Sequence, residues 1–534
     1  MNIPDVQRLS NTSLPTKADD YYELKTPDLR ELEDGAIRPG GPPNIYSWSN
    51  IGLMAQYAAV GVVYGTMYSV IYPFLTNYLR MSGNETTSAS VLITLPYTLK
   101  VFIGIVTDCY PIFGFRRRPY MLLGWVVCFV SLVVMTAMPI GDPYYPDSSW
   151  ASLTTLSAEQ TAQLNTDAQH SGVKYIFLMI IANLGSVVAF TASDGILVEL
   201  AQREPLKTRG ALQAVVYAVQ YSFQIISQAM VGFGLNGADY GGTFSGSMGV
   251  NAVMGVCAAF SLMVMPFSWF CVTEEKTHRR SARKYLYALY ELIQQRVVYQ
   301  IVIFRFCRNV FSYVSVTASF LIQSYWLTVT PVNSSVASII GLIVSAGSLY
   351  LTKQFGLNWN WRYMIAISQI SVIIIDAFPT FFTIWDVYRS QWFWLGVHSN
   401  DRRDVRSAGD HREGNEATVY GLITAVSTLA SPFASVITKS IDGHFDVETE
   451  YIRLDNSYVR SQVTYTYLIA YAFKLFSLQK IETQELKRTG GKNKWIGIGT
   501  IIVIAFSLVW SVMTNLMTMF DSTSCLRIAG GTGC

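Results

Sequence analysis

Long apolar runs recur along the chain at the length that a membrane-spanning helix needs. A helix rises about 1.5 Å per residue, so roughly 20 apolar residues cross the ~30 Å hydrocarbon core of a bilayer. Such runs lie at residues 52–73, 88–107, 120–140, 173–194, 211–235, 250–272, 299–326, 333–352, 362–385, 416–439 and 495–520, with a weaker run at 463–479 and a short one at 391–397. Because lipid offers no partner to a free backbone amide, each run has to form a helix. The sequence therefore predicts an all-α polytopic membrane protein with about 12 spans.

Composition and charge distribution agree with this class. Of the 534 residues, 51% are hydrophobic and only 14% are charged, against about 25% charged in soluble domains. Basic residues gather at Arg116–Arg118, 203–209 and 276–284, whereas the loops 141–172 and 236–249 contain no Lys or Arg. By the positive-inside rule the N-terminus is cytoplasmic. We expect a multi-pass protein of the plasma membrane rather than of an internal membrane.

Two kinds of modification are compatible with this topology. The sequons at Asn84 and Asn333 fall in loops expected outside, where they could carry glycans, although such short motifs also arise by chance. Cys525 and Cys534 follow the last apolar run and could form a disulfide outside the cell. The other five cysteines lie in or beside the spans, where we expect them to act as small apolar side chains.

The segment from Asp108 to Tyr120 joins two spans through a Pro/Gly turn and three arginines. A carboxylate at Asp108 and the guanidinium groups of Arg116, Arg117 and Arg118 could pair across this loop and separate again. The simpler alternative is that the arginines only obey the positive-inside rule. The combination of acid, turn and arginines favours a gating loop on the cytoplasmic side.

Six spans precede a long basic loop, and the other spans follow it. We expect a flexible cytoplasmic tail over 1–50, a six-helix bundle over 51–272, a cytoplasmic linker over 273–298 with a surface helix at Ala282–Gln294, a second helix bundle over 299–520 and a short tail over 521–534. This order resembles the two-bundle fold of the major facilitator superfamily. In such folds the substrate binds near the midplane, between bundles that rock against each other.

Several motifs narrow the resemblance. They lie at Asp108–Trp125, Ser193–Gln213, Asn358–Arg362, Asp376–Asp386 and Glu482–Gly491. Together they resemble the folate-biopterin transporter family. This resemblance implies secondary transport of folates or pterins, or in some branches S-adenosylmethionine, usually with a proton. The partners it implies are a small-molecule substrate, H⁺ and the lipid bilayer, with no cofactor and no nucleic acid, and we expect a monomer.

The chain departs from the family pattern at the tenth span. The run at 391–397 passes into the polar stretch 398–412, which cannot cross lipid, before the pattern resumes at Glu413. We therefore expect an incomplete tenth helix. If this stub counts as a crossing, the basic residues at 487–494 stay on the cytoplasmic side, and we favour that parity. The alternative function is a non-transporting, degenerate or interaction protein of the membrane.

Charged residues inside the expected spans are the candidate site, because an ionisable group at bilayer depth usually faces a cavity or a partner. Lys100 and Asp376 lie near mid-depth. Lys100 could bind an anion or form a structural ion pair. Asp376 could carry a proton, or it could be neutralised by Lys100 or an arginine.

Arg305 and Arg308 lie three residues apart on one face of the seventh span, where they could grip the carboxylates of a folate or merely snorkel to the surface. Asp194, near the end of the fourth span, could accept two N–H groups of a pterin or carry the proton. For Glu199, Glu204 and Arg209 we favour a cytoplasmic charge cluster that pairs internally or caps the next helix.

Other classes fit less well. The chain has no nucleophile triad and no His or Cys spacing for a metal, so we expect no enzyme, no catalytic residues and no metal site. No nucleotide-binding domain for an ATP-driven pump is visible. Sugar carriers have a similar arginine loop, but cations inside the expected spans would not be needed to bind a neutral sugar.

Overall fold

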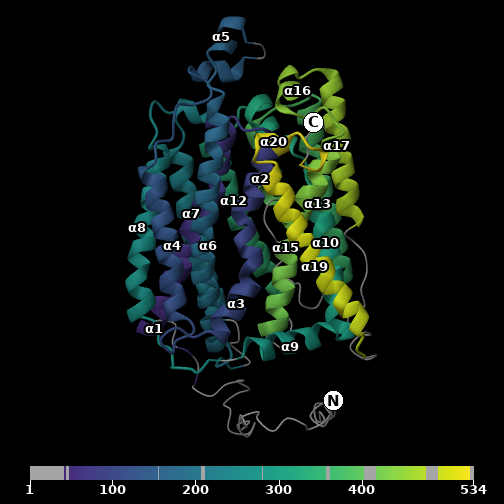
Figure 1. Cartoon of the computed structure of the whole chain (residues 1–534). Coiled ribbons are helices and arrows are strands. Elements are labelled where there is room, and N and C mark those ends of the chain that lie inside the picture. The colour runs from purple at the N-terminus through teal and green to yellow at the C-terminus, as the bar shows by residue number, and fades with distance from the viewer. Residues whose placement is uncertain are drawn as a thin grey trace.

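The computed structural model describes residues 41, 43, 47–153, 156–205, 211–279, 281–355, 361–401, 417–476 and 491–529. Long helices run side by side for the length of the molecule (Figure 1), and the described residues contain no β-strand. We call the end that carries the surface helix α9 (Ala282–Ile293) the α9 end, and the opposite end, which carries α16 (Thr449–Leu454), the α16 end.

The first bundle is built from the N-terminal half. Its helices are α1 (Trp48–Ser69) with η3 (Ile71–Tyr78), α2 (Gly83–Thr94), η4 (Leu95–Leu99), α3 (Lys100–Cys109), α4 (Arg118–Ala137), α6 (Asp167–Ala201), α7 (Ala211–Gly234) and α8 (Gly249–Phe270), with the short η5 (Ser148–Ser152), α5 (Ala158–Ala162) and η6 (Ala238–Tyr240) in the loops. The expected second span is broken at Pro96, which cannot donate to the α-helical ladder. The chain passes through a 3₁₀ segment there, and α3 begins at Lys100.

The second bundle follows α9. It contains α10 (Arg296–Tyr313), α11 (Ala318–Leu321), η7 (Ile322–Trp326), α12 (Pro331–Phe355), α13 (Trp361–Ile384), α14 (Gln391–Asp401), α15 (Ala417–Asp442), α16, α17 (Ser457–Phe476) and α19 (Lys494–Met517), then α20 (Asp521–Ser524) and η10 (Arg527–Ala529). Within the described residues, seven helical stretches are long and apolar enough to cross a membrane. The all-α polytopic fold is confirmed.

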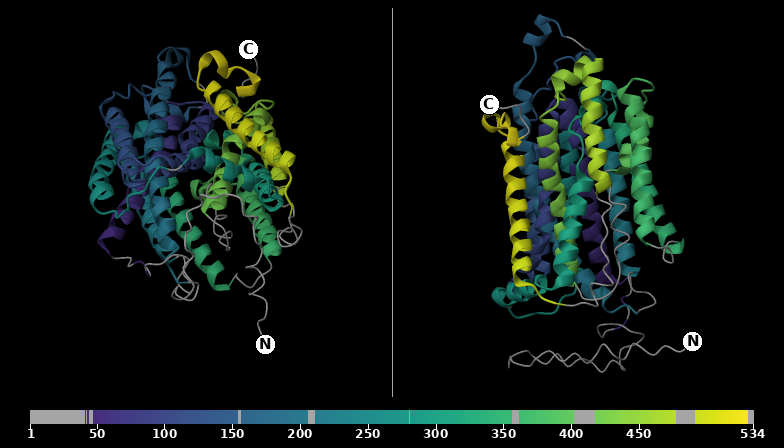
Figure 2. Two further views of the ribbon diagram at one scale, coloured as in Figure 1. Left: turned by 60° about the horizontal axis from the view of Figure 1, so that its bottom comes forward. Right: turned by 90° about the vertical axis from the view of Figure 1, so that its right-hand side faces the viewer.

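The linker helix lies where the sequence placed it. Helix α9 runs across the foot of the molecule, at a steep angle to the long helices, in Figure 1 and in the right-hand view of Figure 2. Its Leu286 and Tyr287 are exposed, and Arg283 and Lys284 are exposed beside them. An exposed apolar pair next to basic side chains suits the interface between lipid tails and headgroups.

The described part of the expected tenth span is short, and its incompleteness stays a prediction. Helix α14 has 11 residues, and a rise of 1.5 Å per residue gives it a length of about 16 Å, roughly half of the hydrocarbon core. It is nevertheless well seated, since Trp394 is fully buried and α14 packs against α12 and α13. The polar stretch that follows, at 402–416, lies outside the described residues.

The direction of α19 agrees with the parity that counts the stub. The backbone N–H of Asn493 donates to the carbonyl of Gln294 (3.0 Å), and that of Arg296 donates to Gly491 (3.0 Å). Helix α19 therefore starts at the α9 end, beside the linker helix, and runs to the α16 end (Figure 1). The basic residues Lys492 and Lys494 lie on the same side as the basic linker.

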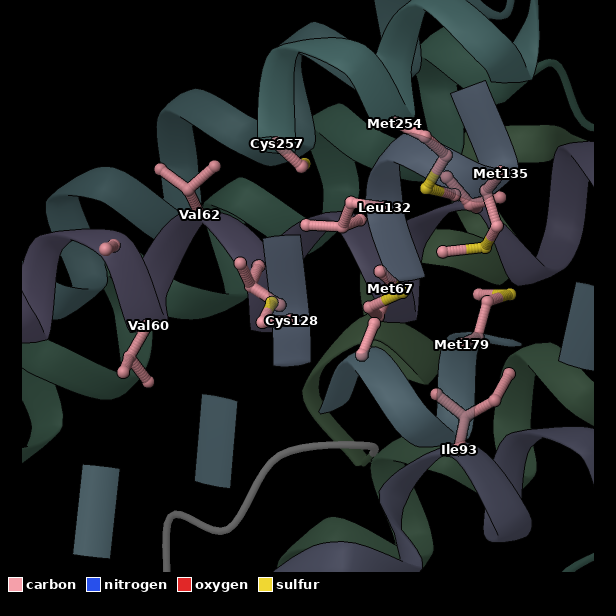
Figure 3. Close-up of a cluster of buried hydrophobic side chains, with 14 of the residues drawn as sticks. Val60, Val62, Met67, Ile93, Cys128, Leu132, Met135, Met179, Met254 and Cys257 are labelled. Atoms are coloured by element: carbon pink, nitrogen blue, oxygen red, sulfur yellow. The ribbon is translucent and has the colours of Figure 1, made fainter. Parts of the chain in front are cut away.

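Two clusters of buried apolar side chains form the cores of the two bundles. The first draws on residues 53–272 and the second on residues 293–471, with one contribution each from the other half: Met519 in the first and Tyr72 in the second. Sulfur-bearing side chains are frequent in the first core, where Met67, Met135, Met179 and Met254 converge with two cysteines (Figure 3). Methionine fills irregular space between helices that cross closely.

Helices α4 and α6 approach each other through a pair of glycines. A Cβ on Gly124 would lie 2.5 Å from the carbonyl oxygen of Gly185, and a Cβ on Gly185 would lie 2.6 Å from that of Gly124. Small residues at such a crossing let two backbones meet in lipid, where van der Waals packing rather than hydrophobic expulsion holds helices together.

We expect Gly185→Ala to separate α4 from α6 and to destabilise the first bundle by ~1–3 kcal/mol, the usual cost of overpacking. The measurement is thermal unfolding of the purified protein in detergent. Gly104→Ala is the matched control, since the nearest heavy atom to a Cβ there is 3.9 Å away. Equal unfolding temperatures for the two variants would contradict this account of the crossing.

An ion cluster at the α16 end fixes the start of α14. Arg389 donates to Asp455 with its two terminal guanidinium nitrogens, at 2.6 and 2.9 Å, and Arg460 donates to the same carboxylate at 2.9 Å. Burial alone would raise the pKa of Asp455, but the hydrogen bonds from Arg389 and Arg460 outweigh it and hold the pKa below its usual value.

A carboxylate whose pKa falls on folding stabilises the protein above its unfolded pKa of about 3.9, and this contribution disappears as the pH drops through the folded value. We therefore expect Asp455→Asn to lower the unfolding temperature at neutral pH and to lose this difference from wild type in acid. Glu159→Gln, on the exposed α5, is the control. A deficit that persists unchanged through the acid range would show that the charge is not responsible.

Candidate functional site

Lys100 and Asp194, both predicted as site residues, form an ion pair inside the first bundle. The ammonium of Lys100 donates to Oδ2 of Asp194 at 2.9 Å, and the hydroxyl of Tyr57 donates to Oδ1 at 2.6 Å. The Lys100 and Asp194 side chains keep 20% and 30% of their surface exposed. The pair is thus only partly exposed and lies well within the helix bundle.

Aromatic rings surround this pair. The Lys100 ammonium lies 3.4 Å from the ring centroid of Phe190 and 5.7 Å from that of Tyr97. Tyr57 packs edge-on against Phe190 and Tyr217, at 5.4 and 5.7 Å between centroids, and Tyr64 packs against Tyr97 at 5.3 Å. We call Tyr57, Tyr64, Tyr97, Phe190 and Tyr217 the aromatic cage.

The break at Pro96 explains how the chain builds this site. The 3₁₀ segment η4 lies between α2 and α3, and it packs against both α6 and α15. Lys100 is the first residue of α3, so it leaves the break directly opposite Asp194 on α6. The kink thereby brings a cation, an anion and Tyr97 together on the side of the first bundle that faces the second.

Asp376 belongs to a separate site in the second bundle. It is almost fully buried, its carboxylate accepts a hydrogen bond from Tyr471 at 2.9 Å, and the ammonium of Lys474 lies 3.9 Å away. The alternative that Lys100 neutralises Asp376 is wrong, because Lys100 pairs with Asp194 and Lys474 takes its place. Arg305 and Arg308 are half-buried on α10.

The predicted gating loop forms a compact polar cluster at the α9 end. Arg117 donates to Asp108 Oδ1 at 2.6 Å and to the hydroxyl of Thr107 at 3.0 Å. A Cβ on Gly195 of α6 would lie 2.4 Å from the Arg117 guanidinium carbon. The guanidinium therefore lies flat against the backbone of α6, in space that only glycine leaves open. We call Asp108, Arg117 and Gly195 the latch.

Glu274, a residue not predicted as functional, completes this cluster. Its carboxylate accepts hydrogen bonds from the backbone N–H groups of Arg116, Arg117 and Arg118, at 2.7–3.1 Å. These amides open α4, so an acid from the chain beyond α8 caps that helix and meets its positive dipole end. The Thr277 N–H also donates to the Gly114 carbonyl at 2.8 Å. The start of the linker is thus fixed to the loop.

The expected cytoplasmic charge cluster is only partly as predicted. Among the residues that the structure describes, Glu199 lies 3.9 Å from Arg116 of the gating loop. Glu204 accepts a hydrogen bond from the Leu212 N–H at 2.8 Å and so caps α7, the helix that follows it. Arg209 lies outside the described residues, and Arg118 lies 5.5 Å from the ring of Phe115.

At the α16 end a polar network closes the two bundles against each other. Arg80 of the first bundle donates to the hydroxyl of Ser324 in the second at 2.7 Å, and its guanidinium lies between the rings of Tyr145 and Tyr325, 5.1 and 5.0 Å away. Ser324 donates on to Asn77 at 2.9 Å. The sequence carries one signal for this contact, an arginine at the end of a long apolar run.

The predicted modification sites lie at the same end. Asn84 and Asn333 are half-buried in the first turns of α2 and α12, and the amide of Asn333 donates to Gln391 at 2.5 Å. Glycosylation of either stays a prediction. Cys525 is disulfide-bonded, while Cys534 lies outside the described residues, so their pairing also stays a prediction.

Comparison with known proteins adds two findings. Residues 60–149, which include Lys100 and the gating loop, match the BT1 family. The chain is 24% identical to the folate-biopterin transporter of Synechocystis over 51% of this chain and 46% of that protein. It is 31% identical to folate transporter 1 of Plasmodium falciparum over 18% of each. The chain thus spans less than half the length of either relative.

Among solved structures, a bacterial homologue of the human drug peptide transporters superimposes with a TM-score of 0.50 at 10% identity, over 83% of this chain and 99% of that one. The molecule therefore has a two-bundle fold of the major facilitator type. Its predicted resemblance to the folate-biopterin transporter family is confirmed by the match of residues 60–149 and by both relatives.

The contact between Arg117 and Gly195 in the latch can be tested with two single variants and the double variant. We expect Arg117→Ala and Gly195→Ala each to destabilise the α9 end by ~1–3 kcal/mol, since each removes or displaces a buried charged hydrogen bond. Because both changes act on one contact, the double variant should unfold at nearly the same temperature as the single ones. The measurement is thermal unfolding of the purified protein. Simple addition of the two effects would show that Gly195 does not act through Arg117.

Proposed function

We propose that this chain is a secondary active transporter of folate- or pterin-type anions that works by alternating access. The observation that carries the proposal is the partly exposed Lys100–Asp194 pair within the aromatic cage. A flat heteroaromatic ring stacks on aromatic side chains, an ammonium attracts its negative charge, and a carboxylate accepts the paired N–H groups of a pterin. The resemblance to folate transporters supports the same substrate class.

The pair also suggests how a proton could be coupled to the substrate. In the structure the charge of Lys100 is balanced by Asp194 at 2.9 Å. A proton on Asp194 would cancel that balance and leave the ammonium free for an anion. Tyr57, which donates to the same carboxylate, would keep Asp194 in place during the exchange. The substrate and the proton would then enter together and leave together.

In alternating access the two ends of the molecule would open and close in turn. The Arg80–Ser324 contact joins the bundles at the α16 end, so the structure is closed there. By the positive-inside rule, the α9 end faces the cytoplasm and the α16 end the exterior. The latch would then stabilise one arrangement of the cytoplasmic ends of α3, α4 and α6, and its release would accompany the other.

The remaining predicted residues have subordinate roles in this scheme. Arg305 and Arg308, half-buried on α10, are candidates to bind the glutamate carboxylates of a folate in bidentate fashion. Asp376, with Lys474 and Tyr471, is a second place where a proton could be held inside the membrane.

Uptake into proteoliposomes tests the proposal. With labelled folic acid or biopterin and an inwardly directed proton gradient, we expect concentrative uptake that is faster when the external solution is acidic. Lys100→Gln should weaken substrate binding roughly 10- to 150-fold, because a hydrogen bond to a charged group contributes ~1.5–3 kcal/mol. Asp194→Asn should abolish concentrative, pH-dependent uptake.

Lys174→Gln is the matched control, since it removes an exposed lysine from the opposite end of α6. Normal transport by Lys100→Gln, together with unchanged pH dependence in Asp194→Asn, would remove the pair from the mechanism. Binding of the substrate without uptake by the wild-type protein would instead support the second candidate function.

That second candidate is a membrane protein that binds but does not transport. It is favoured by α14, which at 11 residues covers only part of the membrane thickness. Sequencing the transcript across codons 390–420 and 470–485 shows whether apolar residues are missing from the sequence at these two places, and so separates the two candidate functions. A transcript that encodes further apolar residues would make the second bundle complete and favour transport.

A further inference from the structure

A lysine that the proposed transport mechanism does not use is buried near the α16 end. Lys439 lies in the last turn of α15, and its side chain has no exposed surface. It is among the largest fully buried side chains of the described residues. An ammonium in such a place has to find hydrogen-bond acceptors, because burying it without them is very unfavourable.

Three oxygen atoms surround the ammonium of Lys439. It donates to Oγ of Ser88 at 2.9 Å, to Oδ1 of Asn515 at 3.0 Å and to Oγ1 of Thr518 at 2.9 Å. An ammonium group has three N–H donors, so each one has an acceptor. All three acceptors are themselves fully or almost fully buried.

Two of the three acceptors, Asn515 and Thr518, are held by further hydrogen bonds that leave a lone pair for the cation. The amide nitrogen of Asn515 donates to the carbonyl of Ser511 at 2.8 Å, which leaves the amide oxygen facing Lys439. The one proton of the Thr518 hydroxyl has the Thr514 and Ala529 carbonyls as acceptors, at 3.1 and 2.9 Å, which leaves its oxygen free to accept from Lys439. The surroundings are thus built to receive a positive charge whether or not that charge belongs to a side chain.

The set of acceptors is electrically neutral. Among the described residues no carboxylate lies within ion-pair distance of Lys439. Asp442, one turn further along α15, is engaged by the N–H and the hydroxyl of Thr317, at 2.7 and 2.8 Å. A ring of neutral oxygens is how proteins bind a small monovalent cation rather than how they form an ion pair.

The site also joins the two bundles. Ser88 belongs to α2 of the first bundle, whereas Asn515 and Thr518 lie at the end of α19 in the second. In Figure 1 these helices lie beside α15 near the α16 end. Any motion that parts the bundles at this end has to take Ser88 away from the ammonium.

We propose that Ser88, Asn515 and Thr518 form a binding site for a small monovalent cation of the ammonium class, which Lys439 fills with its own side chain. Occupation of this site holds the α16 end closed. The protein thereby carries as a side chain a cation that would otherwise have to be bound from solution. This site does not involve the transported substrate, so the result of its test does not depend on whether the proposed transport function is correct.

Chemical rescue tests the proposal on the full-length protein. Lys439→Ala empties the site while Ser88, Asn515 and Thr518 remain. The closure is read as the distance between spin labels on cysteines introduced at the exposed Ser149 and Glu450, one in each bundle, with the exposed Cys307 replaced by serine. Ammonium chloride, methylammonium chloride and choline chloride are compared at equal ionic strength.

We expect the label distance of Lys439→Ala to lengthen and broaden, and ammonium or methylammonium to restore the wild-type distribution and unfolding temperature. Choline, which is too bulky for the site, should restore neither, and the parent protein should respond to none of the three salts. A wild-type distance distribution in Lys439→Ala, or equal responses to all three salts, would overturn the proposal.

Ser88→Ala provides a second test that leaves the lysine in place and removes the acceptor of the first bundle. Because Ser88→Ala removes a hydrogen bond to a charged group, we expect it to shift the equilibrium toward an open α16 end by at least about tenfold. Ser90→Ala, two residues along the same helix and half-buried, is the matched control. If Ser88→Ala gives the same label distances as Ser90→Ala, the site does not hold the bundles together.

Discussion

Charge inside the membrane is the constraint on which the arrangement of this molecule depends. The buried cations of the described residues are stabilised in different ways. Lys100 shares its charge with Asp194 and an aromatic ring, and Lys474 lies near Asp376. Arg80 is enclosed by two tyrosines and a serine. Since a charge without a partner is costly at bilayer depth, these contacts decide which helices have to be neighbours, and apolar packing fills the space between them.

Most of the fold could be predicted from the sequence, because the length of an apolar run is fixed by the thickness of the bilayer. The surface helix α9 and the short α14 were also predictable, since amphipathic spacing and a sudden polar stretch are local signals. The breaks inside spans were not. Pro96 interrupts the second span and brings Lys100 into the site, but a proline inside an apolar run fixes neither the direction nor the size of the resulting kink.

The candidate site was only half visible in the sequence. Lys100, Asp194 and Asp376 stand out as charges within apolar runs, but their partners depend on how helices far apart in the chain are placed. Lys474 was missed because the apolar run around it is weak and the lysine looked like the end of a span. Lys439 was missed for a similar reason, because it lies at the end of the apolar run 416–439. Glu274 gave no signal at all, since an acid beside Glu275 in a basic loop is unremarkable until three amides at the start of α4 are found around it.

The linker between the bundles is fastened at both ends. Glu274 and Thr277 tie its start to the first bundle, and Gln294 and Arg296 tie its end to the chain that opens α19. Between these attachments lies α9, a helix of 12 residues and therefore about 18 Å long. A helix of that length resists both stretching and compression. It would act as a strut that sets a fixed spacing between the inner ends of the two bundles, so that their relative motion becomes a pivot about α9 rather than a free separation.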